Sequence, residues 1–435
     1  MAVSPRTEGI LGLVPAAVRE VCNVLHQAGH EAYVVGGAIR DLLLGRAVAP
    51  DWDVATSALP ESILRLFPRA IPTGIAHGTV TVVHCNQTVE VTTFRAESGY
   101  ADGRHPDSVV FLRTLEDDLA RRDFTVNALA LDVRDGSLRD PFGGAEDLAR
   151  RRIRAVGRPR ERLAEDGLRA LRAVRFAATL EFTIDPEVLE AISETLSTFR
   201  RLARERIRGE LEKLLTAPRP SLGLTPAEAT GLLREILPEI GEAPEITRRR
   251  AFARVDVAPA DWILRFAALH LDLGAEAARQ ALERLRPARR DLDRVTALVR
   301  AFPRLVSVEP EGSEVRRVLA AIGRERAGEA LDLWSAELRV GSPTPLAARR
   351  ALTVQALARE ALQSGVPLAV TELALNGDDV QAVLGTESGP LVGSALRVLL
   401  DLVLADPSRN DPESLRKHLR ARFGSRQTTP HPQGR

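Results

Sequence analysis

The sequence has little of what stabilises small secreted domains. Among its 435 residues only Cys22 and Cys85 are cysteines, which excludes a disulfide framework and a zinc site built from cysteine pairs. A reducing cytoplasm is therefore the expected compartment. Aromatic residues make up only 4% of the chain, too few for an extended surface that stacks single-stranded bases.

Long apolar runs are also missing. No run approaches the roughly 18 residues that a membrane-spanning helix needs, and the N-terminal region does not have the layout of a signal peptide. We therefore expect no membrane contact. Nothing in the sequence identifies a protein partner.

The net charge of +1 is the small difference between 60 basic and 59 acidic residues. Arginine supplies nearly all the basic charge, with clusters at residues 248–250 and 289–290. The planar guanidinium group suits phosphates, so the composition permits nucleic-acid binding. A GC-rich genome explains the arginine content equally well, and composition alone favours that explanation.

The pattern of the chain changes near residue 146. Before it, short β-rich runs alternate with Gly, Pro and Asp; after it, apolar residues such as Leu168, Leu171 and Val174 recur at helical spacing to about residue 420. The expected strands cover residues 32–35, 80–84, 88–93 and 126–133, and Pro-containing joints interrupt the helices near residues 218–220, 303–310 and 343–345. This predicts an α+β protein: a small mixed-sheet head followed by an all-helical neck, body and tail. The predicted parts are a head (1–145), a neck (146–220), a body (221–365), a tail (366–424) and a flexible C-terminus (425–435).

The sharpest motif is Gly36-Gly37, followed by a short helix and then Asp51-Trp52-Asp53. In a strand, residues i and i+2 point to the same face, so Asp51 and Asp53 would aim together. Paired carboxylates suit Mg²⁺, which binds one or two carboxylates and substrate phosphates. The two glycines let backbone amides approach a triphosphate, and Arg40 could add a phosphate contact. Each half alone is weak, because a lone Asp-x-Asp is usually a solvated turn.

Residues 33–55 resemble the signature of the polymerase-β-like nucleotidyltransferases, in the class II branch that contains tRNA CCA-adding enzymes and bacterial poly(A) polymerases. The spacer at residues 47–50 is slightly longer than in that family. Further segments resemble the family in the same order along the chain: residues 74–80, 90–95, 121–128, 140–144, 205–211 and 373–379. We expect residues 205–211 to hold the neck helices.

The resemblance implies a catalytic centre in which Asp51 and Asp53 hold two Mg²⁺ ions. Glu90 is a candidate third ligand, although an edge carboxylate in solvent is an equal alternative. The residues that the motifs and the resemblance together assign to nucleotide binding are Gly36, Gly37, Arg40, Arg122, Asp123, Asn127, Asp166, Arg169, Arg172 and Arg175.

Asp166 and Arg169 are expected to read the base. If a helix opens at Glu165, these two residues lie on one face of it, three positions apart. A carboxylate accepts from the exocyclic amine of cytosine or adenine, and a guanidinium donates to the ring nitrogen, whereas uracil and guanine present the reverse order. The family usually has Pro where this chain has Gly167. The alternative is an amphipathic helix with an intrahelical ion pair, and Arg175 suits packing as well as nucleotide contact.

The expected function is addition of the 3′-terminal CCA to tRNA from CTP and ATP, with the helical part binding the acceptor and T arms. An A-adding enzyme that works with a CC-adding partner is the alternative. A candidate flexible loop lies at residues 100–108, with Tyr100, Asp102, Gly103 and Arg104, and it has full length. By the resemblance, family members restricted to CC addition lack part of this loop, so a CC-only enzyme is disfavoured. A poly(A) polymerase and a non-catalytic RNA-binding protein are more distant alternatives. No histidine is followed by Asp, so we expect no appended His-Asp phosphohydrolase domain.

Overall fold

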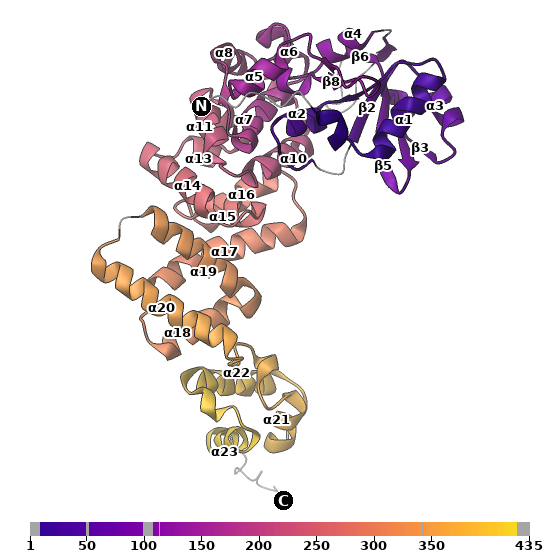
Figure 1. Ribbon diagram of the computed structural model, residues 1–435. Coiled ribbons are helices and arrows are strands. Elements are labelled where there is room, and N and C mark those ends of the chain that lie inside the picture. Colours follow the sequence, from indigo (N-terminus) through magenta and orange to yellow (C-terminus); the bar gives the residue numbers. More distant parts are fainter. Residues whose placement is uncertain (1–8, 49–51, 99–107, 113, 342, 424–435) are drawn as a thin grey trace, which may run out of the picture. The chain divides into compact units, whose positions relative to one another are not determined.

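The computed structural model describes residues 9–48, 52–98, 108–112, 114–341 and 343–423 (Figure 1). The chain separates into two compact units, residues 1–244 with 284–286, and residues 245–283 with 287–435. The predicted division into head, neck, body and tail is finer than these two units and stays a prediction. No helix of the described ranges has the length and apolarity to span a bilayer.

A seven-stranded mixed sheet forms the core of the head, in the order β3-β4-β5-β2-β1-β8-β9. Strands β2 and β5 are parallel, and the other neighbours are antiparallel. The strands are β1 (Ala32–Val35), β2 (Trp52–Thr56), β3 (Ala70–Gly74), β4 (Thr79–His84), β5 (Gln87–Thr93), β8 (Ala130–Leu131) and β9 (Leu138–Arg139). Two further pairs are β6 (Arg95–Ser98) with β7 (Ser108–Phe111), and β10 (Arg152–Ile153) with β11 (Thr183–Ile184).

Alternation along the strands buries one face of the sheet. Val54, Val89 and Val91 are fully buried, and helices α1 (Ala16–Gln27) and α3 (Pro60–Leu66) pack beside these strands (Figure 1). Asp53 on β2 and Thr88 and Glu90 on β5 are exposed instead. The sheet is therefore covered on one face and open in part on the other, where polar residues can reach a ligand.

The prediction of a strand over residues 126–133 is wrong for most of that range. Residues 125–127 form a 3₁₀ turn, and only Ala130–Leu131 pair as a strand. The amides of Asn127 and Ala128 donate to the carbonyls of Phe124 and Thr125, which diverts this backbone from the sheet. The apolar run is buried on all sides, and apolarity alone does not separate a strand from a buried turn.

Helices dominate the described chain from residue 144 onward, as the sequence predicts, and others lie between the strands of the head. In the first unit they are α2 (Gly37–Leu43), α4 (Leu115–Ala120), α5 (Gly144–Ala149), α6 (Pro159–Glu165), α7 (Leu168–Leu180), α8 (Pro186–Glu194), α9 (Leu196–Phe199), α10 (Arg204–Leu215), α11 (Ser221–Ala229), α12 (Leu232–Ile236) and α13 (Pro238–Gly241). The joint predicted near residues 218–220 separates α10 from α11. Helix α7 packs against α10 and α11 and forms the centre of this helical layer.

The second unit is built from helices alone in its described part. They are α14 (Glu245–Val257), α15 (Trp262–His270), α16 (Ala275–Arg284), α17 (Arg289–Ser307), α18 (Gly312–Ile322), α19 (Arg324–Val340), α20 (Pro345–Gln363), α21 (Gly377–Leu384), α22 (Pro390–Ala405) and α23 (Pro412–Phe423). The joint expected at residues 303–310 is shorter than predicted, because Pro303 lies inside α17. The motif at residues 373–379 forms a capping box, in which Asn376 and Asp379 satisfy each other's backbone amides at the start of α21.

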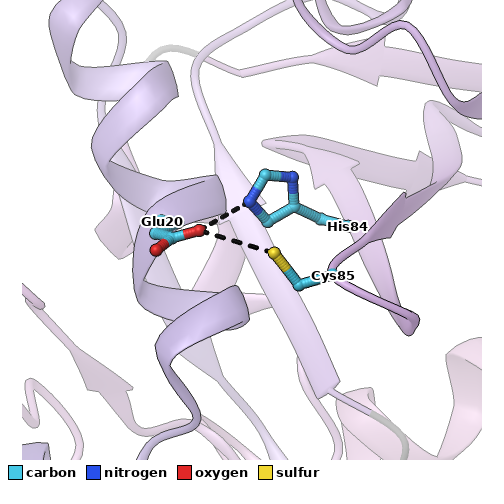
Figure 2. A group of neighbouring side chains, drawn as sticks. All are labelled: Glu20, His84 and Cys85. Atoms are coloured by element: carbon cyan, nitrogen blue, oxygen red, sulfur yellow. Dashed lines mark hydrogen bonds and ion pairs between the residues drawn. The ribbon is translucent and has the colours of Figure 1, made fainter.

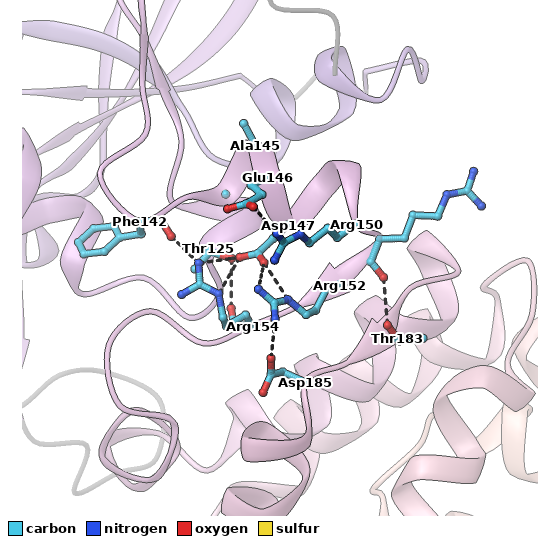
Figure 3. A network of polar contacts seen from close by, with 12 residues as sticks. Thr125, Phe142, Ala145, Glu146, Asp147, Arg150, Arg152, Arg154, Thr183 and Asp185 are labelled. Carbon is cyan, nitrogen blue, oxygen red and sulfur yellow. Dashed lines mark hydrogen bonds and ion pairs between the residues drawn. The ribbon is translucent and has the colours of Figure 1, made fainter. Parts of the chain in front are cut away.

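A buried carboxylate on α5 ties the 3₁₀ turn at residues 125–127 to β10 and to Arg154, just after that strand. Asp147 accepts from the Thr125 hydroxyl at 2.6 Å, from Arg152 at 2.7 Å and from Arg154 at 2.9 Å (Figure 3). Its side chain is 1% exposed, whereas the two arginines are about one-third exposed. Removing one partner of a buried ion pair leaves the other charge without compensation. We therefore expect the loss of the Asp147 carboxylate to lower the free energy of unfolding strongly.

We predict that Asp147→Ala lowers the free energy of unfolding of the first unit by about 3 kcal/mol, the lower end for a buried pair because the arginines are partly exposed. Trp52 is the one tryptophan of that unit, so its fluorescence in a Trp262→Phe, Trp334→Phe background reports the urea transition. Glu146→Ala is the control, because Glu146 pairs with Arg150 in solvent, and it should cost less than about 1 kcal/mol. Equal losses in the two variants would contradict the prediction.

Candidate active site

A tight turn opens the site at the end of β1. Gly36 has φ of 78° and ψ of −142°, a conformation that side chains disfavour, and it precedes α2. A Cβ on Gly36 would lie 3.0 Å from Nη1 of Arg122 and 3.6 Å from Oδ2 of Asp53. The glycine therefore lets a cation and a carboxylate approach the backbone closely. The approach of a triphosphate to the backbone amides of Gly36 and Gly37 stays a prediction.

Two carboxylates lie side by side on the open face of the sheet. Asp53 on β2 pairs in register with Glu90 on the parallel strand β5, and both side chains are exposed while their strand neighbours are buried. Register partners in a sheet share a face, so both groups offer oxygen ligands on that face. Asp51 lies outside the described residues. The assignment of Asp51, Asp53 and Glu90 to a metal stays a prediction, with a donor chemistry that fits Mg²⁺.

Asp123 is the centre of a buried polar network behind this turn. Its carboxylate accepts from Arg172 at 2.6 Å, from the Asn127 amide at 3.1 Å and from the backbone of Phe124 at 2.8 Å. Asn127 in turn accepts from Arg40 at 2.7 Å. Burial raises the pKa of Asp123, but Arg172 and these hydrogen bonds outweigh it and hold the pKa at about 2. The network therefore stays ionised at neutral pH.

The sequence analysis expects a helix to open at Glu165 in the predicted base-reading segment, and this expectation is wrong. Helix α6 ends at Glu165, Asp166 is extended, and α7 begins at Leu168. The reason is local: Oδ1 of Asp166 accepts from the Leu168 amide at 3.0 Å, a side-chain bond that competes with helix formation. Asp166 and Arg169 are therefore not neighbours on one helical face.

Separate partners orient these two residues. Oδ2 of Asp166 accepts from Arg206 on α10 at 2.8 Å. Arg169 donates to Glu165 at 2.5 Å and to the carbonyls of Arg162 and Arg121 at 2.8 and 3.0 Å. A carboxylate offers about four lone-pair positions and a guanidinium five N–H groups, so both residues keep capacity for a base. The intrahelical ion pair expected under the alternative reading is replaced by these contacts.

A cavity of about 360 Å³ brings the two motifs together. Its described lining includes six arginines and three aspartates, an excess of positive charge that suits a triphosphate. Of the predicted residues, it collects Gly36, Gly37, Arg40, Asp53, Arg122, Asp123, Asn127, Asp166, Arg169 and Arg172. The sequence analysis did not assign Arg121, Leu168, Phe176 and Arg206 to the site, and they also line the cavity.

Arg175 is the predicted nucleotide ligand that the cavity lining does not include. Its side chain is 11% exposed, forms an ion pair with the buried Glu210, and stacks over Phe176 with its guanidinium carbon 3.8 Å from the ring centroid. Arg40 and Arg172 also lie over that ring, each at 5.3 Å. Arg175 therefore packs against Phe176, which lines the cavity, and pairs with Glu210. The predicted loop residues Tyr100, Asp102, Gly103 and Arg104 lie outside the described residues.

Comparisons with known proteins agree on one family. The Poly A polymerase head domain family matches residues 32–154, and the family described as a probable RNA and SrmB-binding site of polymerase A matches residues 181–243. The CCA-adding enzyme of Geobacillus stearothermophilus is 36% identical over 411 residues, which are 94% of this chain and 97% of that relative. The CCA-adding enzyme of Levilactobacillus brevis is 52% identical over 214 residues, 49% of this chain and 53% of that relative.

A solved structure is similar over nearly the whole chain. The crystal structure of the Bacillus stearothermophilus CCA-adding enzyme in complex with CTP is 33% identical, with a TM-score of 0.76, and covers 94% of this chain and 98% of that one. Its likeness includes both the sheet and the helical layers described above. The coverage extends well beyond the shared head domain.

Gly167 lies between Asp166 and Arg169, the two residues predicted to read the base. Its φ of −57° is one that proline would also adopt, but there is no room for a side chain. A Cβ there would lie 2.7 Å from the Phe199 amide nitrogen and 2.8 Å from its Cα. We predict that Gly167→Ala lowers the free energy of unfolding by about 1–3 kcal/mol, as overpacking does. Gly209→Ala is the control: nothing lies within 4 Å of its Cβ, and inside α10 it should add about 0.5–1 kcal/mol. Chemical denaturation measures both, and a neutral Gly167→Ala would show that α9 yields easily.

Proposed function

The chain belongs to the CCA-adding enzyme family, and we propose that it completes the 3′ end of tRNA by adding CCA from CTP and ATP without a nucleic-acid template, releasing pyrophosphate. The observation that carries the proposal is the single cavity that joins the Gly36 turn and Asp53 to Asp166 and Arg169. A relative that is 33% identical over nearly the whole chain binds CTP in its crystal structure. One cavity of this kind can hold a triphosphate at one end and a base at the other.

The carboxylates supply the metal side of the site. Asp53, together with Asp51, would hold Mg²⁺, with Glu90 beside Asp53 as a third oxygen donor. When bound, Mg²⁺ stabilises the charge on the attacking and leaving oxygens of a phosphoryl transfer. Arg40 and Arg122 lie at the Gly36 turn, where they would orient the phosphates of the incoming nucleotide. The helical part of the chain would bind the acceptor and T arms of tRNA through phosphate contacts and shape.

The base is selected by hydrogen-bond polarity. Asp166 accepts from the exocyclic amine of cytosine or adenine, and Arg169 donates to the adjacent ring nitrogen. Arg206 and Glu165 hold these two side chains in place, so they meet the base without reorganising. UTP and GTP would leave buried polar groups unpaired, at a cost of about 1–3 kcal/mol for each group.

The proposed function is tested with three tRNA substrates, ending before, within and after the CC, each given CTP alone, ATP alone or both. The proposal predicts two C additions with CTP, one A addition after CC, and no extension of mature tRNA. Addition of A alone would identify an A-adding enzyme, and continued A addition to mature tRNA would identify a poly(A) polymerase. Either result would overturn the proposal.

We predict that Asp53→Asn lowers the rate of nucleotide addition by at least about 1,000-fold, because it removes a charge that holds the metal. tRNA binding, measured by filter retention, should stay within about twofold, since the carboxylate faces the nucleotide. Glu61→Gln on α3 makes the same charge change at an exposed position of the head and is the control. Turnover close to that of the unmodified protein would exclude Asp53 from the active site.

Arg169→Ala is predicted to relax base selection. Loss of one donor to the ring nitrogen should reduce the preference for CTP over UTP by roughly 5- to 150-fold, the equivalent of 1–3 kcal/mol. Single-nucleotide extension with each of the four triphosphates measures the preference. Arg158→Ala, at a side chain 83% exposed at the N-cap of α6, is the matched control. A slower enzyme with unchanged preference would show that Arg169 is structural.

A further inference from the structure

Three potential metal ligands meet on the surface of the head, on residues that the proposed function does not use. Glu20 projects from α1, and His84 and Cys85 lie where β4 turns into β5 (Figure 2). Nε2 of His84 lies 2.7 Å from Oε2 of Glu20, and Sγ of Cys85 lies 3.8 Å from the same oxygen. All three ligand atoms fall within 4.8 Å of one another. The cluster thus joins a helix to a hairpin that are more than 60 residues apart in the sequence.

The hairpin turn holds the thiol in this position. Cys85 and Asn86 connect the paired residues His84 and Gln87, and their φ values are 46° and 59°. Two positive φ values are the conformation of a type I′ turn, which favours Asn, Asp and Gly. Asn86 fits this preference, but Cys85 does not. Turn chemistry therefore does not explain the cysteine.

A thiolate, an imidazole and a carboxylate are ligands that Zn²⁺ binds well. Zinc bonds of about 2.0–2.3 Å in tetrahedral geometry place ligand atoms about 3.3–3.7 Å apart. The distances of 2.7 and 3.8 Å in the cluster lie on either side of this range, so small side-chain rotations would suffice. Both His84 and Glu20 are partly exposed, with 32% and 55% of their side chains accessible, so an ion can enter from solvent.

We propose that Glu20, His84 and Cys85 bind one Zn²⁺ ion, with water in the fourth position. On binding, the Cys85 thiol loses its proton to solvent and the sulfur forms a bond to zinc, with no change in oxidation state. The ion would cross-link α1 to the β4–β5 hairpin. Mg²⁺ would not compete, because it prefers oxygen ligands and octahedral geometry. Conversely, the oxygen-only set around Asp53 lacks the soft ligand that favours zinc.

The test uses the full chain, freed of metal with a chelator and kept reduced with a phosphine, and titrated with Co²⁺ in excess Mg²⁺. Mg²⁺ occupies carboxylate sites, so a thiolate-to-cobalt charge-transfer band reports the cysteine cluster. The proposal predicts that this band saturates at one equivalent, appears with the visible bands of four-coordinate cobalt, and disappears when one equivalent of Zn²⁺ is added. Zn²⁺ should also raise the melting temperature of the chain by a few degrees.

Matched variants assign the ligands. Cys85→Ser should abolish the charge-transfer band, and His84→Ala or Glu20→Gln should weaken Co²⁺ binding at least tenfold. Cys22→Ala, at the buried cysteine of α1, should keep the band. All variants should retain nucleotide addition and their far-ultraviolet circular dichroism, which separates this proposal from the proposed function. A missing band, a band that survives in Cys85→Ser, or saturation at half an equivalent, as two chains sharing one ion would give, would overturn it.

Discussion

The ionised carboxylate of Asp123 joins the two ends of the proposed active site. On one side it accepts from Arg172 of α7, the helix that also carries Arg169. On the other side it accepts from Asn127, which accepts from Arg40 of α2, just after the Gly36 turn. The chain of hydrogen bonds thus spans from the phosphate end to the base end. A buried charge tolerates little displacement of its partners, so the separation of the two ends is held firmly.

Under the proposed function, this rigidity would let protein side chains replace a template. A template base presents donors and acceptors in a fixed order, and Asp166 and Arg169 do the same only if neither side chain rotates. Arg206 fixes Asp166, while Glu165 and the Arg121 carbonyl fix Arg169. In the proposed mechanism, selectivity therefore depends also on the residues that orient Asp166 and Arg169. Preorganised polar groups act in this way because they do not have to reorient when the ligand arrives.

Much of this arrangement could be predicted from the sequence. The features that the sequence did not predict depend on contacts that no local pattern shows. A β-rich run predicted the strand of Glu90 over residues 88–93, and the Asp51-Trp52-Asp53 motif placed Asp53 on a strand after the helix that begins near Gly37. The start of α7 at Leu168 depends on a side-chain hydrogen bond of Asp166, which competes with a helical pattern that looks continuous. Arg206 reaches the site across 40 residues of sequence, and no local pattern reports such a pairing.

The central claim is that Asp123 and Arg172 act as one unit in aligning the nucleotide. The most direct measurement is the rate of single-nucleotide addition for Asp123→Asn, Arg172→Met and the double variant. Misalignment by about 1 Å costs on the order of 100-fold, so each single variant should lose at least that much. The account predicts that the double variant is no slower than the slower single variant, because both changes break the same link. Losses that multiply in the double variant would contradict it.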